Sequence, residues 1–401
     1  MKGKSNTPAI RFKGFNDDWE QRKLGECAGF RRGSFPQPYG NKEWYDGEGA
    51  MPFVQVADVA DDMKLVDDTK QKISKLAQPM SVYADKGSVL VTLQGSIGRV
   101  AITQYGAFVD RTVLIFDKYN QDIDKTFWAY IIKEKFIDEA RKAPGGTIKT
   151  ITKEALSDFD LMLPNYDEQK KLGAFLVSID NLITLHQRKL EKLQNIKKSM
   201  LEKMFPQNGS NVPEIRFKGF TDAWEQRKVG DFMSESRELG HKGDIAHKMT
   251  VKLWGKGVYE KNDTGSANTQ YFTRHAGQFI YSKLDFLNCA FGVVPDELES
   301  LETTADVPAF DCDGVNPYFM FYMAIQPSFY EKNGMLADGS RKAKRIHANT
   351  FLNMPFMVPT LEEQNKIVNL LNVLDDLITL HQRKLEKLQN IKKSMLEKMF
   401  V

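Results

Sequence analysis

The sequence has little cysteine and no long apolar run. Its 401 residues include three cysteines, Cys27, Cys289 and Cys312, with no CxxC pair and no paired Cys/His spacing. We therefore expect neither a disulfide framework nor a structural zinc site, and a reducing compartment is the plain interpretation. No segment approaches the ~18 apolar residues that a membrane span needs, and the first residues lack the apolar core of a signal peptide. These absences predict a cytoplasmic protein with no membrane partner.

Motifs of common enzyme classes are also missing. There is no GxxxxGK[ST] phosphate loop, no HExxH sequence and no cluster of His and Cys. Residues 316–319 (NPYF) superficially resemble the Asn-Pro-Pro-aromatic motif of amino-methyltransferases, but the second proline is absent and no glycine-rich cofactor loop precedes them. We expect no catalytic residue and no bound metal or cofactor. A methyltransferase with a divergent cofactor site is an alternative that binding of S-adenosylmethionine would test.

Two internal repeats organise the chain. Residues 8–23 match residues 213–228 at thirteen of sixteen positions, and the 24 residues 182–205 recur unchanged as residues 377–400. The segments between the repeats share almost no direct sequence. The repeats predict six parts: a repeated amino-terminal segment (1–23), a globular domain (24–163), a long helix (164–206), a linker with the second copy of the amino-terminal segment (207–228), a second globular domain (229–358) and a second long helix (359–401).

The two helical segments have apolar residues in steps of three and four, which predicts helices with a coiled-coil seam. Both helices lead back to the repeated amino-terminal segments, so we expect them to pair antiparallel. The residues expected to face one another are Leu176, Ile179, Ile183, Leu190 and Leu193 on one helix and Leu371, Leu374, Ile378, Leu385 and Leu388 on the other. His186 and His381 also fall on the seam, either as polar residues that fix the register of the helix pair or as ordinary half-solvated side chains.

Basic charge is concentrated in the 24-residue repeat. The net charge is only +3, but each copy contributes +4, which leaves −5 for the rest of the chain. The repeats therefore present either solvated coiled-coil faces or surfaces for phosphates and acidic partners.

The two globular segments differ in sequence but share a layout. Each has a hairpin (residues 88–103 and 278–294), then an aromatic helix (from 125 and from 316) and then a glycine-led polar loop (145–149 and 339–345). Cations and polar groups at matching points of two similar domains are candidates for DNA contact, with solvated loops as the alternative. These residues are Gln94, Ser96, Arg99, Thr147 and Lys149 in the first domain and Lys252, Lys283, Arg341, Lys342, Lys344 and Arg345 in the second.

Together these features resemble the specificity subunit of type I restriction–modification systems. The matching stretches include RFKGF…DDWEQRKLGE from residue 11 with its copy from residue 216, the Pro-x-x-x-Glu-Gln helix entries at 164–169 and 359–364, GSIGRVAI within residues 87–102, and GQFIYSKLDFLNCAFGVV at 277–294. The resemblance implies an α+β fold in which two similar α/β target recognition domains are separated by two long antiparallel helices, with pseudo-two-fold duplication.

The same resemblance implies a non-catalytic bacterial subunit that binds double-stranded DNA. Each recognition domain would read half of a bipartite target, while the helices set the spacer and dock two modification subunits. Those partners would methylate adenine N6 with S-adenosylmethionine, and restriction subunits would use ATP and Mg for translocation and cleavage. The alternative from another class is a coiled-coil scaffold that joins two ligand-binding domains and has no role on DNA.

Overall fold

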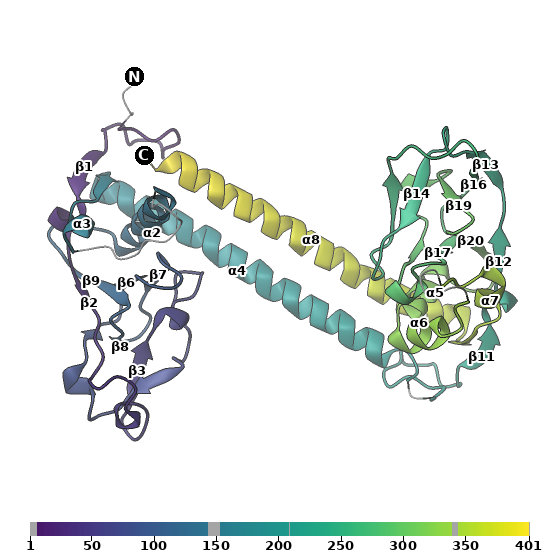
Figure 1. Ribbon diagram of the computed structural model, residues 1–401, viewed down its shortest axis with the longest axis horizontal. Helices are drawn as coiled ribbons and strands as arrows, with labels where there is room; N and C mark the ends of the chain where they lie inside the picture. Colours follow the sequence, from purple (N-terminus) through teal and green to yellow (C-terminus); the bar gives the residue numbers. More distant parts are fainter. Residues whose placement is uncertain (1–5, 143–152, 208, 339–343, 401) are drawn as a thin grey trace. The chain divides into compact units, whose positions relative to one another are not determined.

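The computed structural model describes residues 6–142, 153–207, 209–338 and 344–400 (Figure 1). Contacts divide the chain into two compact units. Unit 1 comprises residues 1–188 and 382–401, and unit 2 comprises residues 189–381. Each long helix, α4 (Tyr166–Lys203) and α8 (Leu361–Met399), therefore begins in one unit and ends in the other. Both are the long helices that the apolar spacing predicts.

Unit 1 contains two four-stranded sheets. The first is antiparallel, in the order β2 (Ala28–Arg32), β9 (Val113–Tyr119), β6 (Val89–Thr92) and β7 (Val100–Ile102). The second has the order β4 (Gln71–Ile73), β3 (Met51–Val54), β8 (Ala107–Val109) and β5 (Tyr83–Ala84), with β3 and β8 parallel. Helix α2 (Lys125–Lys142) packs on the first sheet, where the ring of Trp128 meets that of Phe116 at 5.5 Å. Its aromatic residues Phe127, Trp128 and Phe136 are buried in the core.

Unit 2 repeats this strand topology on a different sequence. Its antiparallel sheet has the order β12 (Met233–Ser236), β20 (Ala309–Cys312), β17 (Phe279–Tyr281) and β18 (Phe291–Val293). Its second sheet has the order β13 (Leu239–Lys242), β16 (Gln270–Thr273), β19 (Glu302–Thr304), β14 (Lys248–Val251) and β15 (Val258–Lys261). Strands β14 and β19 are parallel, as β3 and β8 are, and β13 is an addition. The two predicted hairpins are confirmed as β6–β7 and β17–β18.

Smaller elements flank the sheets of each unit. Antiparallel pairs join β1 (Glu20–Lys23) to β10 (Asp160–Leu163) and β11 (Glu225–Lys228) to β21 (Pro355–Val358). The short helices are α1 (Leu24–Cys27), α3 (Lys153–Ser157) and α7 (Ala348–Leu352).

The aromatic helix expected from residue 316 is two helices, which corrects the prediction. Helix α5 (Pro317–Ala324) ends before α6 (Pro327–Gly334) begins. Pro327 has no N–H to donate and its ring clashes with a preceding helical turn, whereas the first position of a new helix suits it.

The repeated amino-terminal segment is fixed to the start of a long helix by the same buried ion pair in both units. The Arg11 guanidinium donates to both carboxylate oxygens of Glu168 at 2.8 Å. Arg216 makes the same pair of bonds with Glu363, at 2.7 and 2.8 Å. Both carboxylates are buried, and these hydrogen bonds raise the pKa of each arginine. Bidentate geometry of this kind fixes orientation as well as adding energy.

The carboxyl end of α4 packs into unit 2, and the carboxyl end of α8 packs into unit 1. In unit 2, the Phe205 ring just after α4 lies 6.0 Å from Trp224 and 5.6 Å from Phe319. Unit 1 repeats this cluster with Phe400, Trp19 and Phe127. A main-chain hydrogen bond is also common to both units. Ile215 N–H donates to the Lys203 carbonyl, and Ile10 N–H donates to the Lys398 carbonyl, both at 2.9 Å.

Within each unit the two helices run antiparallel. In unit 1, Lys392 Nζ lies 2.5 Å from Asp180, which also accepts from the Tyr130 hydroxyl. Farther along α8, Met399 joins the apolar cluster of Leu172 and Leu176, so numbers rise along α8 as they fall along α4. Unit 2 has the equivalent trio of Lys197, Asp375 and Tyr322.

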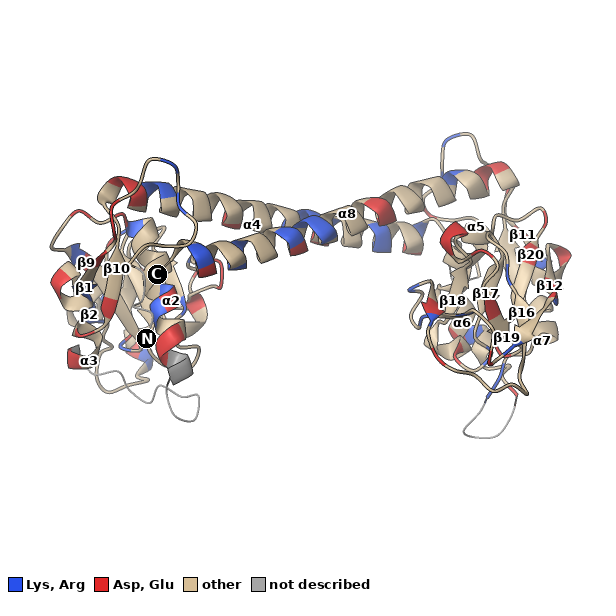
Figure 2. Ribbon diagram, turned by 90° about the horizontal axis from the view of Figure 1, so that it is seen from above, with Lys and Arg blue, Asp and Glu red and all other residues tan. Residues whose placement is uncertain are grey.

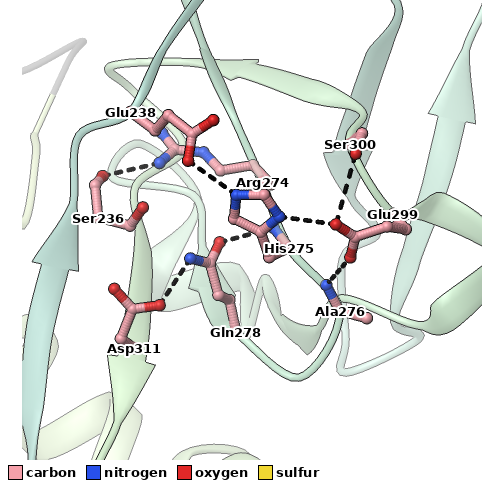
Figure 3. A network of polar contacts seen from close by, with 9 residues as sticks. All are labelled: Ser236, Glu238, Arg274, His275, Ala276, Gln278, Glu299, Ser300 and Asp311. Atoms are coloured by element: carbon pink, nitrogen blue, oxygen red, sulfur yellow. Dashed lines mark hydrogen bonds and ion pairs between the residues drawn. The ribbon is translucent and has the colours of Figure 1, made fainter.

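A polar network joins the β12–β13, β16–β17 and β18–β19 connections of unit 2 (Figure 3). The buried Arg274 guanidinium donates to the Ser236 carbonyl and the Thr303 hydroxyl, both at 2.8 Å, and desolvation lowers its pKa to about 10. Next to it, His275 bridges Glu238 (2.8 Å) and Glu299 (2.6 Å). The hydrogen bond with Glu238 and, to a smaller extent, the one with Glu299 raise the pKa of His275.

The buried pair predicts a large effect of neutralising Glu363. We expect Glu363→Gln to lower the free energy of unfolding of unit 2 by about 3 kcal/mol, because Arg216 keeps a buried charge without its counter-ion. The neighbouring Glu362 is the matched control, since its pair with Lys366 is exposed and Glu362→Gln should cost less than about 1 kcal/mol. Urea unfolding followed by circular dichroism measures both. Equal losses in the two variants would show that the buried pair is not the stabilising contact.

The His275 bridge predicts a stability that depends on pH. A raised pKa in the folded state means that the histidine stabilises unit 2 fully below its unfolded pKa of about 6.5 and loses that contribution as pH rises through the folded value. The melting temperature should therefore fall more between pH 6 and pH 9 in the wild type than in His275→Gln. The exposed His347, as His347→Gln, is the control and should keep the wild-type profile. A His275→Gln profile that matches the wild type would contradict this assignment.

Candidate nucleic-acid interface

Three connections occupy matching places in the topology of the two units. In unit 1 they are the β3–β4 connection, the β6–β7 turn and the segment after α2. In unit 2 they are the β14–β15 turn, the β17–β18 connection and the segment after α6. Every candidate for DNA contact that the structure describes falls in or beside one of these connections. Arg341, Lys342, Thr147 and Lys149 lie outside the described residues.

In unit 2, the structure brings Lys283 and Arg345 together. The backbone of Lys283 donates to the Asp306 carbonyl (2.9 Å) and accepts from the N–H of Ile346 (3.0 Å). Arg345 Nε lies 3.4 Å from Asp306 Oδ1. A pair of backbone hydrogen bonds between Asp338 and Arg345 closes the base of the polar loop and leaves Lys344 exposed beside it.

Lys252 lies on the adjacent β14–β15 turn. Its N–H donates to the Gly257 carbonyl (2.8 Å), and its Nζ lies 5.2 Å over the Tyr259 ring. The turn is held against the β17–β18 connection by hydrogen bonds from Trp254 N–H to Asn288 (2.9 Å) and from Gly255 N–H to Cys289 (2.7 Å). The same connection reaches the end of α6, where Leu287 packs so closely that a Cβ on Gly334 would clash. The three connections of unit 2 therefore form one surface.

In unit 1, Gln94 and Ser96 are exposed on the β6–β7 turn. The Thr92 hydroxyl closes this turn, since it donates to the Ser96 carbonyl (2.5 Å) and accepts from the Arg99 N–H (3.0 Å). The Arg99 guanidinium reaches the β3–β4 connection, with Nε 3.0 Å from Asp61 and Nη1 3.4 Å from the Val59 carbonyl. Because an exposed pair of this kind is worth about 1 kcal/mol or less, a phosphate can replace Asp61 at little cost.

The charge of the two surfaces differs, which the sequence reasoning did not use. The β3–β4 connection (residues 55–70) carries five aspartates and two lysines, whereas the β14–β15 turn (residues 252–257) carries two lysines and no acid. The second turn also presents Lys256 and Trp254, which sequence reasoning missed. A tryptophan between lysines in a glycine-containing turn, KLWGKG, was the signal that could have found them.

The residues predicted to pair the helices are all buried or half-buried. Leu193 packs against the unit 2 cluster that contains Leu371 and Leu374. In unit 1, however, Leu176 belongs to a cluster that includes the far end of α8, at Met395, Leu396 and Met399. Leu176 is therefore part of the unit 1 core, and the full set of facing residues stays a prediction. Ile179 is buried, while the half-buried members are Ile183, Leu190, Ile378, Leu385 and Leu388. His186 and His381 are also half-buried.

The Asn316 motif has a structural role. Its side-chain oxygen accepts from the N–H groups of Tyr318 (2.9 Å) and Phe319 (3.3 Å), which caps α5. Across the described ranges, no group of three or more His, Cys, Asp or Glu side chains is arranged to hold a metal ion. A helix with the length and apolar character of a membrane span is likewise absent from the described part of the chain.

Comparison with known proteins gives one consistent family. The profile of the type I restriction modification DNA specificity domain matches residues 16–195 and 308–390, more than half of the chain. The type I restriction enzyme MjaVIII specificity subunit of Methanocaldococcus jannaschii is 22% identical over 95% of this chain and 91% of its own length. The MjaX specificity subunit of the same organism is also 22% identical, over 95% of this chain and 92% of its own.

A solved structure shares the fold. The crystal structure of a type-I restriction-modification system S subunit from M. genitalium aligns with a TM-score of 0.62 at 13% identity, and covers 98% of this chain and 99% of its own. The predicted α+β class with duplicated domains and a helix pair is thereby confirmed.

Proposed function

This chain belongs to the type I restriction modification DNA specificity family, and we propose that, as the specificity subunit of such a system, it reads a bipartite sequence in double-stranded DNA. Unit 1 recognises one half of the target through the β3–β4 and β6–β7 connections and the segment after α2. Unit 2 recognises the other half through its equivalent surface. The helices α4 and α8 set the number of unread base pairs between the halves.

The observation that carries this proposal is one strand topology on two unrelated sequences, with the polar and cationic candidates of each in matching connections. Two similar units in one chain imitate a protein dimer, and dimers read paired half-sites on DNA. Different side chains on the same scaffold are what two readers of different half-sites require. A scaffold that joins two ligand-binding domains is not favoured, because the family match is to a DNA specificity domain.

We further propose that the long helices dock two modification subunits. The identical repeat leaves the same two leucines exposed on each helix, at Leu182 and Leu185 and at Leu377 and Leu380. Lys and Arg residues are distributed along both helices (Figure 2). An apolar row bordered by cations suits an amphipathic partner with acidic flanks. Two identical docking rows fit two copies of one partner.

In this proposal the chain itself is non-catalytic and binds no cofactor, and it works in the bacterial cytoplasm. Methyl transfer from S-adenosylmethionine to adenine N6 belongs to the modification subunits. ATP-driven translocation and Mg-dependent cleavage belong to restriction subunits, which join the same complex. Binding of S-adenosylmethionine by the isolated chain would contradict this division of labour.

Selection from random DNA tests the proposal directly. The full chain, with its modification subunits, is incubated with duplexes that carry a long randomised segment, and the retained DNA is sequenced. We expect two short defined sequences separated by a constant number of undefined base pairs. Enrichment of one continuous sequence, or of none, would refute bipartite recognition by this chain.

The polar loop of unit 2 should contribute to one half only. We expect Arg341→Ala with Arg345→Ala to weaken binding at least tenfold, about 1.4 kcal/mol, with any loss of base preference confined to the half read by unit 2. Lys261→Ala is the control, because Lys261 lies at the other end of the β14–β15 hairpin from Lys252. Titration of the selected duplex and of duplexes altered in either half measures the effect. Full binding by the double variant would remove this loop from the interface.

Lengthening both helices should lengthen the spacer. Seven residues inserted after Arg188 and after Arg383 keep the apolar seam on one face and add roughly 10 Å, about three base pairs at ~3.4 Å each. The half-site sequences should stay the same. Seven residues inserted in the linker after Gly209 serve as the control and should leave the spacer unchanged. A folded helix-insertion variant with the original spacer would show that the helices do not measure the DNA.

A further inference from the structure

One tryptophan of the chain stands apart from the others. Trp19, Trp128 and Trp224 are buried in the cores and Trp44 is half-buried, whereas Trp254 on the β14–β15 turn has 61% of its surface exposed. Exposing a large indole to water is unfavourable, since an apolar surface of this size normally finds cover. Its position on the candidate interface of unit 2 indicates a contact surface.

The turn holds Trp254 in a demanding backbone conformation. Its φ angle is 61°, in the left-handed region that residues other than glycine seldom adopt. Hydrogen bonds from the N–H groups of Trp254 and Gly255 to the carbonyls of Asn288 and Cys289 fix this conformation. Backbone strain of this kind persists where surrounding contacts enforce it, and it concentrates at functional sites. The indole is therefore presented by a rigid turn.

The surroundings of Trp254 combine apolar and cationic side chains. Exposed apolar residues on the three connections are Leu253, Leu284, Leu287, Met335 and Leu336. The cations on the same connections are Lys252, Lys256, Lys283, Lys344 and Arg345. The nearby acids are engaged, since Asp285 contacts Ser282 and Asn288 while Asp306 contacts Arg345. An apolar patch with cations around it matches duplex DNA, in which phosphates border the base edges.

We propose that Trp254 is a specificity-determining residue of unit 2, and that its indole face packs against bases in the half-site that this unit reads. The proposal rests on the proposed function and deepens it. An indole carries no charge and has a single N–H donor, so it contributes to base contact and little to phosphate contact. Stacking or wedging of an apolar side chain against a base step depends on how easily that step deforms, which makes the contact sequence-dependent.

The effect should be confined to one half of the target. The equivalent connection of unit 1, residues 55–70, has no tryptophan, and four of its five aspartates are in the run from residue 61 to residue 68. This connection of unit 1 therefore has no counterpart of the Trp254 indole. Loss of the indole should relax one or two adjacent positions of the unit 2 half and leave the unit 1 half as selective as before.

The test compares Trp254→Ala, Trp254→Phe and the control Leu239→Ala in the full chain with its modification subunits. Leu239 is a more exposed apolar residue of the same unit, on β13. Each protein undergoes the random-duplex selection and is titrated with the wild-type duplex. We expect Trp254→Ala to bind at least tenfold more weakly with relaxed base preference, Trp254→Phe to keep part of both, and Leu239→Ala to match the wild type.

Fluorescence provides a second readout that does not need the alanine variant to fold. Base contact should quench the emission of Trp254 on addition of the selected duplex, and Trp254→Phe should lose that quenching. Unchanged affinity and base preference in Trp254→Ala, or a uniform loss at every position, would overturn the role in specificity. A wild type that selects no bipartite sequence refutes the proposed function itself, whereas a normal wild type with an unaffected Trp254→Ala refutes the tryptophan contact alone.

Discussion

The buried bidentate pair at the start of each long helix is the contact on which the rest of the architecture depends. Arg11 and Arg216 come from the repeated amino-terminal segment, and Glu168 and Glu363 come from the helix entry. Because a broken buried pair leaves an uncompensated charge, this contact admits one arrangement of segment and helix. The globular insert is tethered between the two at both ends, so it can change in sequence without disturbing them.

A second constraint acts on the carboxyl ends of the two copies of the 24-residue repeat. Lys197 near the end of α4 and Phe205 just after it lie in unit 2, where they contact Asp375 and Trp224. Lys392 and Phe400 enter unit 1 and meet Asp180 and Trp19. Both units offer the same receiving site, so both helix ends must present the same side chains. Core packing of aromatic rings tolerates few changes of volume, so packing constrains the buried carboxyl ends of the repeat, while the inserts are free to diverge.

The periodicity of the sequence was sufficient to predict the long helices and the hairpins, but not where each helix ends or which distant residues it contacts. The steps of three and four apolar residues predicted α4 and α8, and the hairpins followed from alternating β-branched strands around glycine turns. The break before Pro327 was missed because the aromatic run on both sides reads as one helical face. The packing of Leu176 with Met399 depends on contacts more than two hundred residues apart, which local patterns do not encode.

The candidate interface could likewise be predicted only in part. The positions of cations in loops could be predicted, because glycine and lysine content marks a solvated turn. The ion pair of Arg99 with Asp61 and the exposure of Trp254 could not, since both depend on how separate connections meet. Burial is decided by tertiary packing, and a lone tryptophan in a sequence is more often core than surface.

The division of the chain into units also bears on how it folds during synthesis. Unit 2 is one continuous stretch, residues 189–381, whereas unit 1 combines residues 1–188 with residues 382–401. A ribosome therefore delivers everything that unit 2 needs before it delivers the end of α8. Until then Trp19 and Phe127 lack Phe400, and the first unit keeps an open apolar face. Contacts between such distant residues are slow to form, so unit 1 is the first to be synthesised and the last to complete its core.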